Sequence, residues 1–180
     1  VASVSGEGAL RAWVEVRDGQ AHAAVADLAL RDVALRFAGR EQTLPLARLQ
    51  TRLSGARERG SLRVSAEALS FVSGAIDWPA TRLALVLRER ARAPGAAASA
   101  VTAFDGGEFS ADRIDLAPLA SLAASLPLGQ SLHSLLAALA PSGQLTELAT
   151  RWEGALDAPR RYALKGRAKG LTIAAAPSAV

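Results

Sequence analysis

The sequence predicts a mainly β protein: an elongated, twisted, largely antiparallel curved sheet with a short helical insert at about residues 116–140. Two observations predict the sheet. Segments of strand length in which apolar and polar residues alternate recur along the chain, and short turn-forming segments separate them. A third observation predicts the insert, because Pro118, Pro127 and Pro141 break the apolar run around it. The resulting pieces are shorter than the ~20 apolar residues that a membrane-spanning helix needs.

Residues 1–90 are expected to form an antiparallel meander. The first alternating segment, residues 8–17, places Leu10 and Val14 on one face and charged side chains on the other. The dipeptide 18–19 (Asp-Gly) follows, and it readily adopts the positive φ angles of a tight hairpin turn. The chain then returns as a second strand, which is typical of a meander.

The second strand is expected to contain an irregularity. Its apolar positions include Leu28 and Leu30, and they then change phase to Val33 and Leu35. A slip of one residue turns every following side chain to the opposite face of a strand. We therefore expect a β-bulge or a break near Asp32.

Three further alternating segments complete the expected meander, at residues 44–55, 61–71 and 81–89. A turn is expected at residues 39–41, and the charged residues 56–60 are expected to form a loop. Because alternate side chains of a strand project to the same side, each of these strands is expected to have one apolar face.

The rest of the chain divides into a loop region and a second group of strands. Residues 91–107 begin with a low-complexity run of small residues and are expected to be a loop region. Residues 108–180 are expected to hold a strand, the helical insert and closing strands, with Pro127 separating two helical halves. The leucines of the second half recur at helical spacing, which requires one buried face: Leu132, Leu135, Leu136 and Leu139.

Composition limits the size and the partners of the protein. With 180 residues, the chain is long enough for a single domain. Lys and Arg number 21 against 17 Asp and Glu, a net charge of +4, and the arginines are dispersed, so no nucleic-acid partner is expected. The chain has no Cys, which excludes a disulfide framework and a thiolate metal site. It has no Met and begins with Val1, so we expect an excised piece of a longer protein.

The residues capable of acid–base or metal chemistry are not arranged as a site. His22 and His133 lack a second ligand at helical or hairpin spacing, which a metal site or a general base would need. A catalytic pair of Asp112 and Asp115 is less favoured than Asp115 as the N-cap of the insert. Residues 105–107 (Asp-Gly-Gly) lack the strand–helix context of a phosphate loop and are interpreted as a turn. No enzyme activity, catalytic residue, metal or cofactor is expected.

The tryptophans are interpreted in two ways. A large core anchor is the default interpretation, and it is favoured for Trp152 beside the insert. Trp13 shares its face of the first strand with charged residues. For Trp13, an edge of the sheet and a membrane-like interface both remain open.

The order of these features resembles a known protein family. The opening GEGALRAWVEV is followed by ADLALRDVALRF and LPLARLQTRLSG, and the chain closes with RRYALKGRAKGLTIAAAP. The block 109–154, with its FSADRIDLAPLASLA, LPLGQ and LAPSGQLTELATRWEG pieces, carries most of the resemblance. Together these segments resemble the YhdP branch of the AsmA-like proteins of Gram-negative bacteria, over essentially the whole chain.

The resemblance implies a fragment of a repeating β-groove protein. Family members have a periplasmic body tethered to the inner membrane by an anchor, which would lie outside this fragment. The implied function is non-enzymatic transport of phospholipid acyl chains between the inner and outer membranes, which supports the outer-membrane permeability barrier. The alternative is an envelope assembly or scaffold domain that binds a partner protein through its apolar helical insert.

A lipid carrier needs a continuous apolar surface, and one face of a sheet provides it. Each buried methylene contributes ~0.8 kcal/mol, so exposing an acyl chain of ~16 carbons to water costs on the order of 12 kcal/mol. The side chains expected to line such a groove are Leu10, Val14, Leu28, Leu30, Leu62, Val64, Leu83, Leu85 and Leu87. The same alternation is equally typical of an ordinary core in which the insert covers the apolar face, and this alternative stays open.

Overall fold

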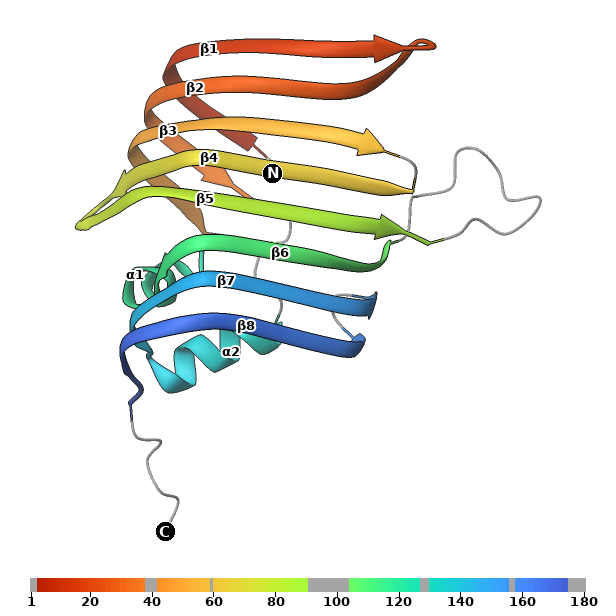
Figure 1. The fold of residues 1–180 in the computed structure, drawn as a ribbon. Coiled ribbons are helices and arrows are strands. Elements are labelled where there is room, and N and C mark those ends of the chain that lie inside the picture. The colour runs from red at the N-terminus through yellow and green to blue at the C-terminus, as the bar shows by residue number, and fades with distance from the viewer. Residues whose placement is uncertain are drawn as a thin grey trace.

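The computed structural model describes residues 3–37, 42–58, 60–90, 104–126, 130–155 and 158–174. Within these residues, eight strands form one sheet in the order β1 to β8 (Figure 1), and all neighbours pair antiparallel. The strands are β1 Ser3–Arg17, β2 Gln20–Arg36, β3 Thr43–Glu58, β4 Ser61–Ser73, β5 Ile76–Glu89, β6 Phe104–Asp115, β7 Ser142–Ala155 and β8 Ala158–Thr172. The predicted mainly β, antiparallel fold is confirmed.

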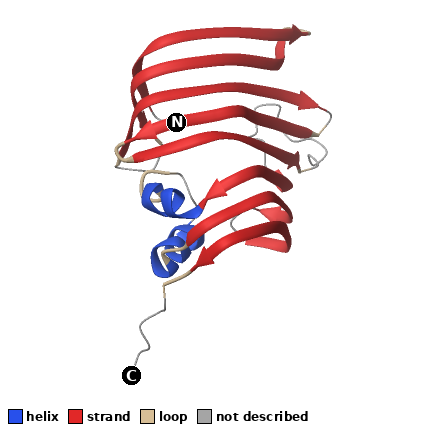
Figure 2. Ribbon diagram, turned by 60° about the vertical axis from the view of Figure 1, so that its left-hand side comes forward, coloured by secondary structure: helices blue, strands red, loops and turns tan. Residues whose placement is uncertain are grey.

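The helical insert lies between β6 and β7. It consists of α1, Leu116–Leu122, and α2, Gln130–Leu139, which confirms the helices predicted at about 116–140; Pro127 itself lies outside the described residues. Both helices lie on one face of the sheet, beside its β6–β8 end (Figure 2), and α1 packs against β6 and β7. This face is called the inner face, and the opposite one the outer face.

The connections between strands agree only in part with the sequence. Asp18 and Gly19 have φ angles of +51° and +73°, so the predicted tight turn between β1 and β2 is confirmed. The expected loop at 56–60 is wrong for residues 56–58, because β3 continues to Glu58. The turn predicted at 39–41 lies outside the described residues, as do residues 91–103 of the expected loop region. The loop expected at 104–107 is wrong, because these residues pair with β5 and β7 as the start of β6.

An irregularity crosses every strand of the sheet. The pairing ladders omit Gly6 of β1, Asp32 of β2, Ala47 of β3, Ala68 of β4, Arg82 of β5, Asp112 of β6, Glu147 of β7 and Gly166 of β8. Asp32, Ala68 and Glu147 have φ angles of +50°, +50° and +52°, as residues at β-bulges do. This line of residues is called the crease, and Figure 1 shows β1, β2 and β3 turning sharply. The predicted break near Asp32 is confirmed.

The crease changes the phase of alternation so that apolar side chains stay on the inner face. Leu30 pairs with Leu49, and Val33 pairs with Leu46. Leu30 and Val33 would project to opposite faces of a regular strand, yet both pack in the same hydrophobic cluster. The change of phase seen in the sequence is therefore the signature of a bent sheet with one apolar side.

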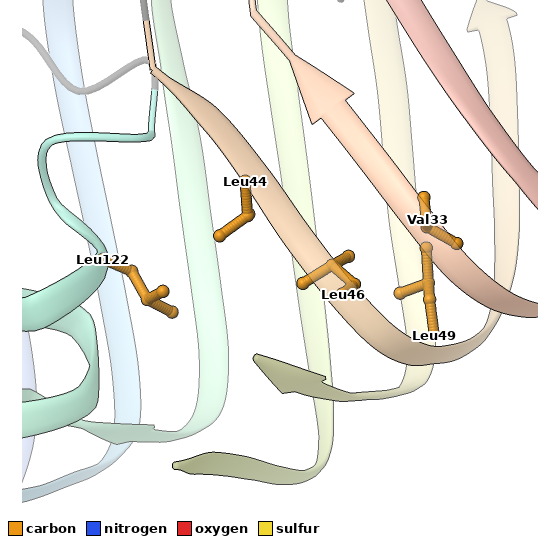
Figure 3. Close-up of a cluster of buried hydrophobic side chains, with 5 residues drawn as sticks. All are labelled: Val33, Leu44, Leu46, Leu49 and Leu122. Atoms are coloured by element: carbon orange, nitrogen blue, oxygen red, sulfur yellow. The ribbon is translucent and has the colours of Figure 1, made fainter. Parts of the chain in front are cut away.

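That hydrophobic cluster joins the helical insert to the bent part of the sheet. It contains Val33 of β2, Leu44, Leu46 and Leu49 of β3, and Leu122 at the end of α1 (Figure 3). Full burial of a side chain of this size contributes roughly 1.5–3 kcal/mol. The cluster therefore holds α1 against the part of β2 and β3 that turns at the crease.

Hydroxyl and carboxylate groups satisfy backbone atoms that the crease leaves out of the ladders. Thr81 is 1% exposed; its Oγ1 donates to the carbonyl of Pro79 at 2.8 Å and accepts from Nε1 of Trp78 at 3.1 Å. The backbone N–H of Arg82 donates to Oδ1 of Asp112 at 2.9 Å. Among the described residues, every buried side-chain nitrogen and oxygen has a hydrogen-bond partner. The bend therefore leaves no buried polar side chain unsatisfied.

The outer face is polar and carries cross-strand ion pairs. Asp27 and Arg52 are register partners whose charged atoms lie 3.3 Å apart. Glu108 and Arg151 are likewise register partners, with an Oε1–Nη1 distance of 3.7 Å. Exposed pairs of this kind contribute at most about 1 kcal/mol each. They identify the outer face as the side of the sheet that faces water.

Replacing Thr81 should destabilise the crease. The substitution Thr81→Val keeps the shape of the side chain but leaves Nε1 of Trp78 buried without an acceptor. We expect the free energy of unfolding to fall by about 1–3 kcal/mol, as measured by urea denaturation. The control Thr43→Val changes an exposed strand residue and should stay within about 0.5 kcal/mol of the wild type. Equal losses in the two variants would contradict the role given to Thr81.

Candidate functional site

An apolar row runs across the inner face from one edge of the sheet to the other. Its members are consecutive register partners: Val14, Ala24, Gly55, Val64, Leu85, Phe109, Thr150 and Leu164. This set is called the central row. Thr150 is its one hydroxyl residue, and its Oγ1 donates to the carbonyl of Phe109 at 3.4 Å. The row therefore forms an apolar path perpendicular to the strands.

The central row forms part of the floor of a large pocket near its β8 end. The pocket has a volume of about 600 Å³, within the range of small-molecule sites. The sheet contributes Leu85, Phe109, Ile114, Leu145, Leu148, Thr150, Trp152, Tyr162, Leu164 and Leu171, with Ile173 just after β8. The insert contributes Leu116, Leu119, Leu135, Leu136, Leu139 and Pro141. This space between β5–β8 and the two helices is called the inner pocket.

A shallower hollow continues the inner pocket toward β1. It has a volume of about 220 Å³, and its lining includes Ala12, Ala24, Ala26, Leu53, Gly55 and Val64. Small side chains make this part of the face concave. Val64 in the hollow and Leu85 in the inner pocket are register partners on adjacent strands. The two concavities are therefore neighbours along the central row.

The helical insert covers only one end of the inner face. The helices lie beside β6–β8 (Figure 2), while Leu10 and Val14 on β1 remain 66% and 58% exposed. At the opposite edge, Leu164 is 62% exposed although it lines the inner pocket. An ordinary core would bury these side chains. The apolar face is thus roofed in its β6–β8 part and open toward β1.

The structure places all nine groove residues predicted from the sequence on the inner face. Leu85 lines the inner pocket, Val64 lines the hollow, and Leu30 packs against the cluster of Figure 3. The other six lie on the same face by register. Val14 belongs to the central row, and Leu10 and Leu28 pair with each other. Leu62 pairs with Leu87, and Leu83 pairs with Ala66, two residues after Val64.

Sequence reasoning missed most of the inner pocket. Phe109, Leu148 and Leu164 line it, but none of them was among the nine predicted residues. The helical spacing of leucines was the available signal for the roof, since Leu136 is buried and lines the pocket with Leu135. That spacing predicts one buried face of a helix and does not say which strands the face covers.

The tryptophans differ in their surroundings. Trp152 is buried and lines the inner pocket, as expected for an anchor beside the insert. Trp78 is buried and stacks on Phe71 with 5.4 Å between ring centroids. Trp13 lies half-exposed on edge strand β1, with the guanidinium carbon of Arg11 6.0 Å from its ring centroid. The edge position suggested for Trp13 is confirmed, and the membrane-like interface stays a prediction.

Asp115 occupies the N-cap position of α1, as predicted, but its carboxylate does not cap the helix. Oδ2 accepts from Nη2 of Arg113 at 2.8 Å, and Oδ1 accepts from Nε2 of Gln144 at 2.9 Å. Partial burial raises the pKa of the Asp115 carboxyl, but these two hydrogen bonds outweigh it, so that the pKa is lower than usual. The carboxylate therefore links β6 to β7 at the start of the insert.

The described residues show no group of side chains arranged to bind a metal ion. No group of three or more His, Asp or Glu among them could hold a metal ion. Asp112 is engaged by the backbone of Arg82 and does not share a site with Asp115. None of the described helices is long and apolar enough to cross a membrane. The inner face with its pocket is the candidate functional site.

The model of the family described as YhdP protein matches residues 2–179. No curated protein and no solved structure matches the chain.

The charge of Asp115 should give the protein a pH-dependent stability. Because the pKa of this carboxyl is below its ordinary value of 3.8 in the folded protein, its contribution is complete above that value and lost as the pH falls through the lowered pKa. We expect Asp115→Asn to be less stable than the wild type at neutral pH, with the difference shrinking in acid. Urea denaturation across pH measures it; a difference that is constant in pH would contradict the role of the charge.

Proposed function

The chain belongs to the YhdP protein family, and from this premise we propose that it is a non-enzymatic segment of a larger cell-envelope protein. In this proposal the inner face carries phospholipid acyl chains between the inner and outer membranes, and so supports the permeability barrier of the outer membrane. The segment works in the periplasm, and an anchor outside it tethers the protein to the inner membrane.

The continuity of the central row is the observation that carries the proposal. An acyl chain in water costs ~0.8 kcal/mol per exposed methylene, so a carrier must keep the chain against apolar surface at every step. The inner pocket and the hollow meet at the paired residues Leu85 and Val64. Because the central row contains no charged residue, an acyl chain moving across the strands would pass from one concavity to the next over apolar surface.

The two faces of the sheet differ as a carrier in water requires. The outer face holds paired charges such as Asp27–Arg52, whereas the inner pocket is lined by apolar residues apart from the hydroxyls of Thr150 and Tyr162. The headgroup of a bound lipid would stay outside the pocket, because a phosphate buried there would lack a partner for its charge. This supports an acyl chain, rather than a whole lipid, as the group that the pocket holds.

The alternative function, a scaffold that docks a partner through the apolar insert, has less support. Leu135, Leu136 and Leu139 of α2 line the inner pocket, so the apolar side of α2 faces the sheet. A docking helix would present that side to its partner. Leu136 is buried and Leu135 is 52% exposed, so only part of this apolar side is accessible to a partner protein while α2 covers the pocket.

Lipid retention tests the proposal directly. We expect the chain purified from a bacterial periplasm to retain phospholipid in native mass spectrometry. Leu164→Glu places a carboxylate on the exposed edge of the inner pocket, and it should reduce the retained lipid at least about tenfold, because an apolar environment disfavours a charge.

The matched control is Ala163→Glu, the neighbouring residue on the outer face, which pairs with Arg151. Both residues lie on the exposed strand β8, so the two variants should fold equally well. The control should retain lipid at the wild-type level. A wild-type chain that retains no lipid, or equal retention in both variants, would contradict the proposal.

A further inference from the structure

Trp152 lies at one end of the inner pocket. Among the pocket-lining residues described on β7, which run from Leu145 to Trp152, it is the last one toward the β7–β8 hairpin. Its side chain is 4% exposed. Gly154, the next residue of β7 on the same face, has no side chain with which to extend the lining. The indole is therefore the last large apolar group of β7 in this direction.

Gly107 gives the indole its position. Trp152 and Gly107 are register partners on β7 and β6. A Cβ at residue 107 would lie 2.5 Å from indole Cζ2, 2.8 Å from Cη2 and 2.6 Å from the backbone carbonyl oxygen of Val86 on β5. No side chain fits there, because the indole and the backbone of β5 occupy the space. The turn expected at residues 105–107 is wrong, since these residues belong to β6. The glycine instead lets the indole lie across β6, so that this one side chain bounds the end of the pocket over two strands, beside its register partner Tyr162 on β8.

We propose that Trp152, seated on Gly107, determines how long an acyl chain the inner pocket accepts. The proposal rests on the proposed function, because it assumes that the pocket binds an acyl chain. Each methylene that leaves water increases affinity about fourfold. Once the end of a chain that lies along β7 meets the indole, additional methylenes gain no apolar contact in that direction and increase affinity no further.

A series of lysophospholipids that differ only in acyl-chain length measures this limit. In the wild-type chain, affinity should rise about fourfold per methylene and then reach a plateau at one chain length. Trp152→Phe and Trp152→Leu shorten the end wall, so the plateau should move to longer chains. Isothermal titration calorimetry gives the affinities, and circular dichroism identifies the folded variants.

Trp78→Phe is the matched control. Trp78 is also buried, but it does not line the inner pocket, so its replacement costs packing without changing the plateau. A plateau that stays at the wild-type length in folded Trp152→Phe, or that moves equally in Trp78→Phe, would overturn the inference and leave the proposed function standing. A wild-type chain that binds no lysophospholipid would overturn the proposed function itself.

Discussion

The structure depends on one constraint: every strand must present its apolar side chains to the same face on both sides of a bend. Strict alternation cannot satisfy this constraint. Without an extra residue at the bend, every second side chain continues to point to the same side of the strand. The positive φ angles of Asp32, Ala68 and Glu147 change that phase at the crease. Val33 and Leu46 then join Leu49 and Leu122 in the cluster that holds the insert against the sheet.

The crease and the insert together divide the inner face into two zones. Toward β8, α1 and α2 roof a pocket of about 600 Å³ with large side chains on its floor. Toward β1, Ala12, Ala24 and Gly55 make a shallow hollow that the helices leave uncovered. The edge strands β1 and β8 each pair on one side only, and the central row ends there in the exposed Val14 and Leu164. Such a face can hold an acyl chain at one end and leave a path across the strands.

The elements were predictable from the sequence because they depend on local patterns. Alternation gave the strands, Asp18-Gly19 gave the first turn, and the change of phase between Leu30 and Val33 located the bulge at Asp32. The pocket was not predictable, because it depends on which strands α2 covers and on cross-strand register, as in the fit of Trp152 on Gly107. The carboxylate of Asp115 was misjudged for a related reason: its partner Gln144 lies on the next strand, beyond the insert.

The central claim is that acyl chains contact the inner face along its whole width and avoid the outer face. Photo-crosslinking in cells that carry the full-length protein tests it most directly, with the probe placed in turn at Val14, Val64 and Leu85. The neighbouring outer-face residues Trp13, Arg63 and Ala84 serve as matched positions. The account predicts phospholipid adducts at all three inner positions and at none of the outer ones. Adducts confined to Leu85, or equal on both faces, would contradict it.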